Sequence, residues 1–277
     1  MKKITMPIMA GLIILTIACA GCTRSEGSNA KSRSAAPYTI EIGGSTSVTP
    51  LMEVLADEYS KVKPNIKVNI SGTGSGDGIT NAGVTYQIGM TSRDLTPVEL
   101  GRGLRAELIA IDGIAVIVNS SNDVSSLTIE QTNGIYTGAI TSWSQVDGKN
   151  APIAVVSREE GSGTRGAFEE IVRFQGKLLP GANQLTSTGA ILANIAQNQD
   201  AIGYISLGSI NDSIKALSVD GVPATAGNVA LGTYKIARPF IVLTGNNIHP
   251  ESAAFVEWIL SEDGQAIVSG RGYISAR

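Results

Sequence analysis

Three segments rich in glycine and hydroxyl side chains recur along the chain, each directly after a predicted strand and directly before a predicted helix. They span residues 44–50, 71–78 and 157–166, and the third also carries Arg158 and two glutamates. Backbone N–H groups at a helix start, hydroxyl donors and a guanidinium are the groups that hold a dehydrated oxyanion. Glycine lets the backbone approach such an ion, because it has no Cβ in the way. The repeated pattern therefore predicts an oxyanion site built from several loops.

Strand and helix patterns alternate through the body of the chain. Residues 38–42 alternate apolar and polar side chains, residues 48–59 place apolar side chains at helical spacing, and residues 66–71 alternate again. Such a unit predicts two parallel strands joined by a crossover helix. Further strands are predicted at 87–91, 108–111, 114–118, 153–156, 202–206 and 238–243, and further helices at 76–83, 97–103, 128–134, 167–174, 191–196 and 250–268.

This alternation is typical of an α/β fold. In open α/β sheets, ligands bind at the carboxyl ends of the strands, where the chain turns into a helix. All three glycine- and hydroxyl-rich segments occupy that position. The sequence thus predicts both the fold class and the edge of the sheet at which the site lies.

The first residues have the features of an export signal. Lys2 and Lys3 precede an apolar run at residues 4–17, and an Ala-Gly pair leads into Cys22. This pattern is typical of a bacterial lipoprotein signal at residues 1–21, cut before Cys22 so that its thiol carries lipid such as palmitate. An ordinary transmembrane anchor is the alternative interpretation.

Residues 22–37 are small, polar and without periodic pattern, so we expect a flexible tether between the lipid and the folded body. The chain has two cysteines, and Cys19 has a poorer lead-in for lipidation than Cys22. The body after the tether has none. It therefore offers no disulfide, no thiol nucleophile and no cysteine metal site.

The net charge of the chain and the spacing of its glycines argue against two classes of partner, nucleic acids and nucleotides. The formal net charge of the chain is −3 and no basic cluster stands out, which argues against nucleic acid. An anion must then be caught by local donors, because the overall charge does not attract it. Residues 71–78 match neither the dinucleotide fingerprint nor the P-loop. Taken alone, this segment could be a flexible loop, and Ser45 or Thr46 could simply cap the helix that follows.

A fourth segment, residues 89–94, closes another predicted strand. Thr91 and Ser92 add hydroxyls, which can both donate and accept hydrogen bonds. This matters for a protonated anion, because some group must accept the anion's own O–H. Arg93 and Asp94 can form a salt bridge that holds the loop.

Together these residues resemble the substrate-binding lipoproteins of bacterial ABC phosphate importers. The blocks that carry the resemblance are Gly-Ser-Thr-Ser, Ser-Gly-Thr-Gly-Ser-Gly, Ile-Gly-Met-Thr-Ser-Arg and Ser-Arg-Glu-Glu-Gly-Ser-Gly-Thr-Arg, joined by residues 138–143 and 203–206. The resemblance implies a two-lobed periplasmic-binding-protein type II fold with two crossover strands and the ligand in the interlobe cleft. Lobe 1 would comprise residues 38–113 and 235–277, and lobe 2 residues 114–234.

The resemblance also implies which residues bind the ligand. The matching positions are Thr46, Ser47, Ser75, Ser92, Arg158, Ser162, Gly163 and Thr164. Glu160 would orient Arg158 without touching the ligand. Some members of the family carry an aspartate where this chain has Ser92, and that carboxylate accepts the proton of hydrogen phosphate. A neutral hydroxyl repels sulfate less, so selectivity against sulfate stays open.

The implied function is capture of inorganic phosphate outside the cytoplasm and its delivery to the permease of an ABC importer. The protein would be a monomer, lipid-anchored at the outer face of the bacterial cytoplasmic membrane, and would need no cofactor or metal. The same fold binding sulfate, molybdate or tungstate is the alternative.

A hydrolase is a further alternative, of another class. It would need a base beside its nucleophile. The one histidine, His249, precedes Pro250 at a predicted helix start, where we expect it to cap the helix. The sequence has no Gly-x-Ser-x-Gly elbow and no metal-ligand cluster, so we expect no catalytic residue.

Overall fold

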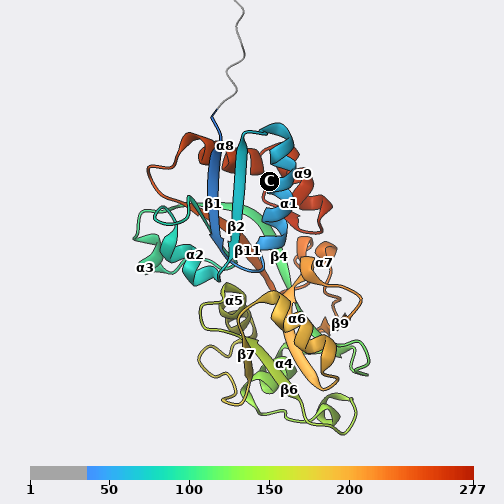
Figure 1. Ribbon diagram of the computed structural model, residues 1–277. Coiled ribbons are helices and arrows are strands. Elements are labelled where there is room, and N and C mark those ends of the chain that lie inside the picture. The colour runs from blue at the N-terminus through green and yellow to red at the C-terminus, as the bar shows by residue number, and fades with distance from the viewer. Residues whose placement is uncertain (1–35) are drawn as a thin grey trace, which may run out of the picture. The chain divides into compact units, whose positions relative to one another are not determined.

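Residues 36–277 are the part of the chain that the structure, a computed structural model, describes (Figure 1). The predicted signal, both cysteines and most of the predicted tether lie outside this part. No helix within residues 36–277 has the length and apolar character needed to cross a membrane. In chain order the elements, with 3₁₀ helices marked η, are β1 (Tyr38–Gly44), α1 (Thr49–Val62), β2 (Ile66–Gly72), α2 (Ser75–Asn81), β3 (Ile88–Thr91), α3 (Pro97–Leu100), β4 (Arg105–Asn119), β5 (Ser126–Leu127), α4 (Ile129–Thr137), η1 (Trp143–Val146), β6 (Ala154–Arg158), α5 (Gly163–Val172), β7 (Asn183–Leu185), α6 (Thr188–Gln197), β8 (Ala201–Ser206), η2 (Leu207–Ser209), β9 (Ile214–Ala216), β10 (Ser218–Val219), α7 (Ala226–Ala230), β11 (Ala237–Thr244), α8 (Pro250–Ile259), α9 (Glu262–Gly270) and β12 (Ile274–Ser275).

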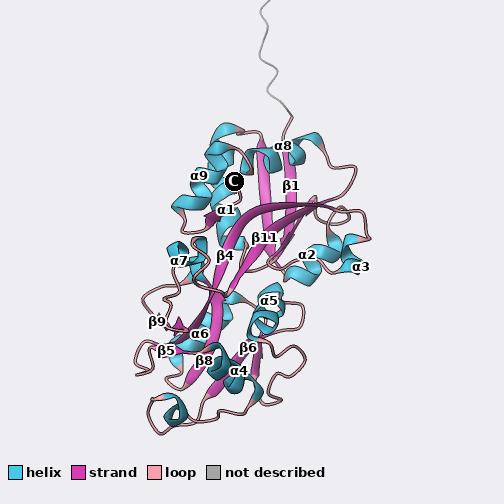
Figure 2. Cartoon of the chain, turned by 180° about the vertical axis from the view of Figure 1, so that it is seen from behind, coloured by secondary structure: helices cyan, strands magenta, loops and turns pink. Residues whose placement is uncertain are grey.

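One mixed sheet runs through the described residues, in the strand order β2, β1, β3, β11, β4, β8, β6, β7. β1 pairs in parallel with β2 and β3, and β6 pairs in parallel with β7 and β8. β11 lies antiparallel to β3 and β4, and β4 lies antiparallel to β8. Figure 2 shows β4 as a long strand that continues from the region of β1 to the region of β8, with β11 beside it.

The sheet has a separate main core toward each end, and these cores define two lobes. In lobe 1 the helices α1, α8 and α9 cover the sheet, and the largest buried side chains of its core include Tyr59, Phe240 and Phe255. In lobe 2 the helices α4 and α5 cover the sheet, and the largest buried side chains include Trp143, Tyr136, Phe168 and Tyr204. β4 contributes to both, with Ile109 in the first core and Ile114 in the second. The two-lobed α/β fold is thus confirmed, while the lobe limits at residues 113/114 and 234/235 stay predictions.

Two predicted strands are joined in the structure, and one predicted helical segment is divided. The strands predicted at 108–111 and 114–118 form the single strand β4, because Asp112 and Gly113 pair with Arg238 and Ala237 of β11; a register shift in this ladder lies further along, between Phe240 and Ile241. The segment 250–268, predicted to be mainly helical, is mainly helical and consists of two helices, α8 and α9. Ser261 caps the second helix, accepting a hydrogen bond from the N–H of Gly264.

Glycine permits close packing of α2 on the sheet. A Cβ added at Gly78 would lie 2.5 Å from the carbonyl oxygen of Met90 in β3 and 2.8 Å from Cα of Gly44 in β1. These are backbone atoms, which cannot move aside as a flexible side chain can. The helix therefore lies directly against the ends of two strands, and this contact fixes where its first residue, Ser75, is placed.

We predict that Gly78→Ala lowers the free energy of unfolding by about 2 kcal/mol, since overpacking a tight contact typically costs that much. Gly189→Ala in α6 is the matched control, because a Cβ there meets no atom within 4 Å. Alanine in a helix should leave stability unchanged or raise it by up to about 1 kcal/mol. Denaturant unfolding of both variants measures the difference, and equal stabilities would contradict this packing account.

Candidate anion-binding site

Hydroxyl groups from both lobes meet in one buried cluster. Ser47, just ahead of α1, has its Oγ 2.8 Å from Thr164 Oγ1 in α5 and 3.1 Å from Thr188 Oγ1 at the start of α6. Thr46 Oγ1 lies 3.3 Å from Thr188 Oγ1 and accepts a hydrogen bond from the Thr188 N–H. Segments that are more than 100 residues apart in the sequence are thus joined through hydroxyls.

A second set of hydroxyls adjoins the first. Ser45 Oγ donates to Ser92 Oγ over 2.9 Å, and Ser75 Oγ lies 3.2 Å from the same oxygen. A Cβ added at Gly163 would lie 2.5 Å from Ser75 Oγ and 2.9 Å from Ser92 Oγ. The absence of a side chain at Gly163 therefore lets the start of α5 in lobe 2 touch both serines of lobe 1.

Four helices begin at these hydroxyls. α1 starts two residues after Ser47, α2 starts at Ser75, α5 at Gly163 and α6 at Thr188. Their first N–H groups have no partner within the helix, and the helix dipoles place partial positive charge at the same ends. Ser162 caps α5 by accepting a hydrogen bond from the N–H of Arg165. The cluster thus combines hydroxyls with helix N-termini, which suits a small anion.

Arg158 ends β6 and is buried, with 2% of its surface exposed. Its Nε and Nη2 donate to the two carboxylate oxygens of Glu159, both over 2.8 Å, and Nε also donates to the carbonyl oxygen of Leu185. The expectation that Glu160 orients this arginine is wrong: Glu160 is exposed, and Glu159 makes the contact. Adjacent glutamates cannot be told apart in the sequence, because the turn after the strand decides which one points back.

Arg238 on β11 is a second buried arginine, and the sequence did not reveal its role. Its Nη1 donates to Thr164 Oγ1 and, over 3.4 Å, to the carbonyl oxygen of Ser92, so it contacts both lobes. Its Nη2 donates to Asp112 Oδ2 on β4 over 3.1 Å. One feature of the sequence could have indicated this role: Arg238 lies in an otherwise apolar predicted strand, and a buried arginine requires a hydrogen-bond acceptor.

Burial dominates the electrostatics of this pair. It raises the pKa of Asp112 to about 6, against the opposing effect of the Arg238 cation. Asp112 Oδ1 and Arg238 Nε have no hydrogen-bond partner among the described residues. A single hydrogen bond therefore joins the two side chains, and Nη1 of Arg238 faces the hydroxyl cluster.

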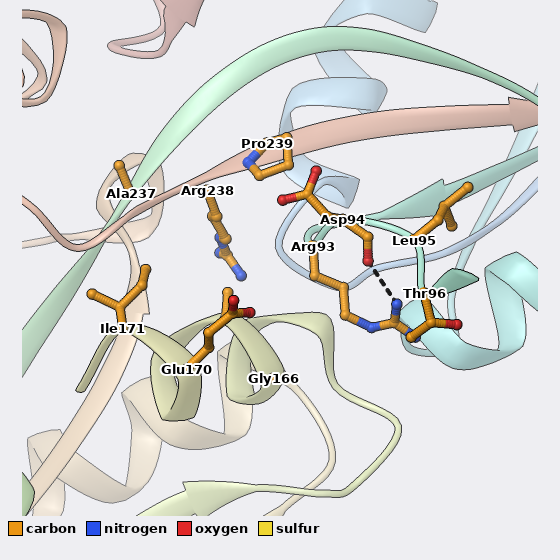
Figure 3. A pocket seen from close by; sticks show the side chains of 11 residues that line it. Arg93, Asp94, Leu95, Thr96, Gly166, Glu170, Ile171, Ala237, Arg238 and Pro239 are labelled. Atoms are coloured by element: carbon orange, nitrogen blue, oxygen red, sulfur yellow. Dashed lines mark hydrogen bonds between the residues drawn. The ribbon is translucent and has the colours of Figure 1, made fainter. Parts of the chain in front are cut away.

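A cavity of about 600 Å³ borders Arg238 on another side. Figure 3 shows the arginine pointing toward Gly166 and Glu170 of α5, across from the loop that holds Arg93 and Asp94. Arg93 is fixed by two hydrogen bonds of 2.8 Å to the carboxylate of Glu99. The cavity lies between elements of both lobes, next to the hydroxyl cluster.

Comparison with known proteins identifies the family. The profile of the PBP superfamily domain matches residues 28–263. The chain belongs to the PBP superfamily. The resemblance read from the sequence is confirmed by this profile together with relatives and a solved structure that are named for phosphate.

Two solved structures and one relative illustrate how far the similarity of this PBP-superfamily chain reaches. A phosphate ABC transporter substrate-binding protein from Clostridium perfringens, solved with bound phosphate, shares 44% identity and a TM-score of 0.85, covering 87% of this chain and 100% of that one. An ABC-type phosphate transport receptor from Vibrio cholerae shares 38% identity and a TM-score of 0.71, covering 86% and 100%. Phosphate-binding protein PstS of Bacillus subtilis is 29% identical, over 99% of this chain and 93% of its own length.

The structure of this PBP-superfamily member brings most of the predicted site residues together. The hydroxyl cluster contains Thr46, Ser47, Ser75, Ser92, Gly163 and Thr164. The Arg158 side chain bonds instead to Glu159 and to the carbonyl oxygens of Leu185 and Thr186, two residues ahead of Thr188. Residues that the sequence analysis did not select, but that the structure places in or beside the cluster, are Ser45, Thr188, Arg238, Asp112 and Glu159.

His249, the histidine that could have served a hydrolase as its base, has another role. His249 caps α8, its Nδ1 accepting a hydrogen bond from the N–H of Glu251, and its ring stacks on Tyr38 with centroids 3.9 Å apart. The capping prediction is thus confirmed. Within residues 36–277 no group of three or more histidine, cysteine or acidic side chains could hold a metal ion.

We predict that Glu159→Gln lowers the free energy of unfolding by about 2 kcal/mol, because the buried Arg158 loses its charge-assisted bonds. Glu160→Gln, one residue further on and exposed, should change stability by less than about 0.5 kcal/mol. Urea unfolding at neutral pH compares the two. A larger loss in the Glu160 variant would favour the assignment made from the sequence over that in the structure.

Proposed function

We propose that this PBP-superfamily chain captures inorganic phosphate between its lobes and delivers it to the permease of an ABC importer. The observation that carries the proposal is the buried contact between Ser47 of lobe 1 and Thr164 of lobe 2. A small tetrahedral anion placed among these hydroxyls would receive donors from both lobes at once. The ligand itself is supported by relatives that are named for phosphate, one of which was solved with phosphate bound.

We propose that the ligand contacts come from the residues selected in the sequence, extended by the other hydroxyls of the cluster. The set is Thr46, Ser47, Ser75, Ser92, Arg158, Ser162, Gly163 and Thr164, with Ser45 and Thr188 added because they bond to these residues. Glu159, in place of Glu160, would hold Arg158 in position. No cofactor or metal enters this proposal.

Neutral dipoles would carry much of the binding. Each arginine beside the cluster has its own carboxylate, Glu159 for Arg158 and Asp112 for Arg238. The anion therefore meets hydroxyls, helix N-termini and two guanidinium groups whose charge is largely offset. Such contacts gain strength when water is excluded, since the local dielectric is then low.

A second oxyanion is the competing ligand, and the observation that favours it is Ser92. Its hydroxyl can accept the proton of hydrogen phosphate, but it does not repel a fully deprotonated anion as a carboxylate would. Sulfate, molybdate and tungstate are therefore the alternatives within the same fold. Binding without turnover is supported by relatives that are named as binding proteins, and we propose that the chain acts as a monomer.

Titration of the protein with phosphate and with sulfate by calorimetry tests this function. We expect one phosphate per chain, and weaker sulfate binding with a different pH dependence, because only phosphate changes its protonation near neutral pH. No heat with phosphate at any pH, together with tight sulfate binding, would replace phosphate by sulfate as the ligand.

We predict that Thr164→Val weakens phosphate binding at least about tenfold, or about 1.4 kcal/mol, because it removes a central donor with little change in shape. Thr80→Val is the matched control, since Thr80 is exposed on α2. Calorimetry on both variants measures the effect. Wild-type affinity in the Thr164 variant would remove the interlobe hydroxyls from the site.

Proteins named PstS, such as the relative from Bacillus subtilis, support a place outside the cytoplasm. We propose that lipid on Cys22 holds the chain at the outer face of the membrane, through the tether at residues 22–37. Cys22→Ser should move the chain from the membrane fraction to the soluble fraction. Membrane fractionation measures this, and a variant that stays in the membrane would indicate a different anchor.

A further inference from the structure

Arg238 and Asp112 face each other on the two antiparallel strands that link the lobes. They are a paired position of the β4–β11 ladder, and 3% and 1% of their surfaces are exposed. A buried ion pair of this kind is seldom retained for stability alone, because the loss of water around both charges offsets much of the attraction. Its place beside the hydroxyl cluster therefore calls for a role in binding.

The hydrogen bonds of Arg238 point to that role. One guanidinium nitrogen, Nη2, serves Asp112, while Nη1 is directed at Thr164 of lobe 2 and the carbonyl oxygen of Ser92 of lobe 1. A guanidinium can only donate, so the Thr164 oxygen must accept in this contact. The proton of the Thr164 hydroxyl is then left to point to another acceptor within the cluster.

We propose that Arg238 is a positioning residue of the anion site, which forces Thr164 to act as a donor to the bound anion. Asp112 holds the guanidinium in place and offsets its charge. This inference rests on the proposed function. It adds that Arg238 determines which protonation state of the anion the site prefers. A site in which the Thr164 hydroxyl must donate favours anion oxygens that carry no proton and can only accept hydrogen bonds.

A comparison of phosphate with sulfate isolates the effect of the Thr164 donor. At about pH 8 phosphate is mainly a dianion with one O–H, and sulfate is a dianion of the same shape without it. Asp112 is ionised at that pH, since its pKa is about 6. The ratio of the two affinities therefore reports the balance of donors and acceptors in the site, with charge and shape nearly constant.

The variants are chosen to separate positioning from a structural role. Arg238→Gln places an amide that can accept as well as donate, and Arg238→Lys keeps a cation that only donates. The double variant Asp112→Asn with Arg238→Gln removes both buried charges together, which avoids leaving one unpaired. It gives a folded comparison if Arg238→Gln alone proves unstable.

Calorimetric titration of phosphate and sulfate at about pH 8 tests the inference. We expect Arg238→Gln and the double variant to lose sulfate affinity at least about tenfold more than phosphate affinity, and Arg238→Lys to keep the wild-type ratio. An unchanged ratio in the glutamine variants, or full recovery of both affinities in the double variant, would overturn the inference. Failure of the wild-type protein to bind phosphate would instead contradict the proposed function.

Discussion

The antiparallel pairing of β4 with β11 is the constraint on which the site depends. β4 supplies apolar side chains to the cores of both lobes, and β11 lies beside it along the join. The pairing places Asp112 opposite Arg238, so the charged pair is positioned by backbone hydrogen bonds rather than by loops. Sites held on regular elements are more rigid than sites on loops, and rigidity lowers the cost of ordering donors around a ligand.

The loops that meet at this point are placed by close packing. Glycines permit two close contacts: within lobe 1 Gly78 lets α2 lie on the strands, and between the lobes Gly163 lets α5 reach Ser75 and Ser92. The result is a dense group of neutral hydroxyls beside two arginines, whose charges are largely balanced by the carboxylates of Glu159 and Asp112. Such an arrangement distinguishes one oxyanion from another by the number of hydrogen bonds that each can donate and accept, and much less by the overall charge of the anion.

Periodicity predicted the order of strands and helices well, because apolar spacing reports the face that each element buries. It missed the continuity of β4, since Asp112 and Gly113 interrupt the apolar pattern although the ladder continues through them. The hydroxyl loops were found because their composition is local. Arg238 and Thr188 were not found as site residues, since their role follows from contacts across more than 70 residues.

A crystal structure of the protein in complex with phosphate would show whether hydroxyls from both lobes bind the anion. We expect one tetrahedral ion between the lobes, within hydrogen-bond distance of the hydroxyls of Ser47, Ser75 and Thr164. An ion bound elsewhere, with these three hydroxyls too far apart to reach a common ligand, would contradict this expectation.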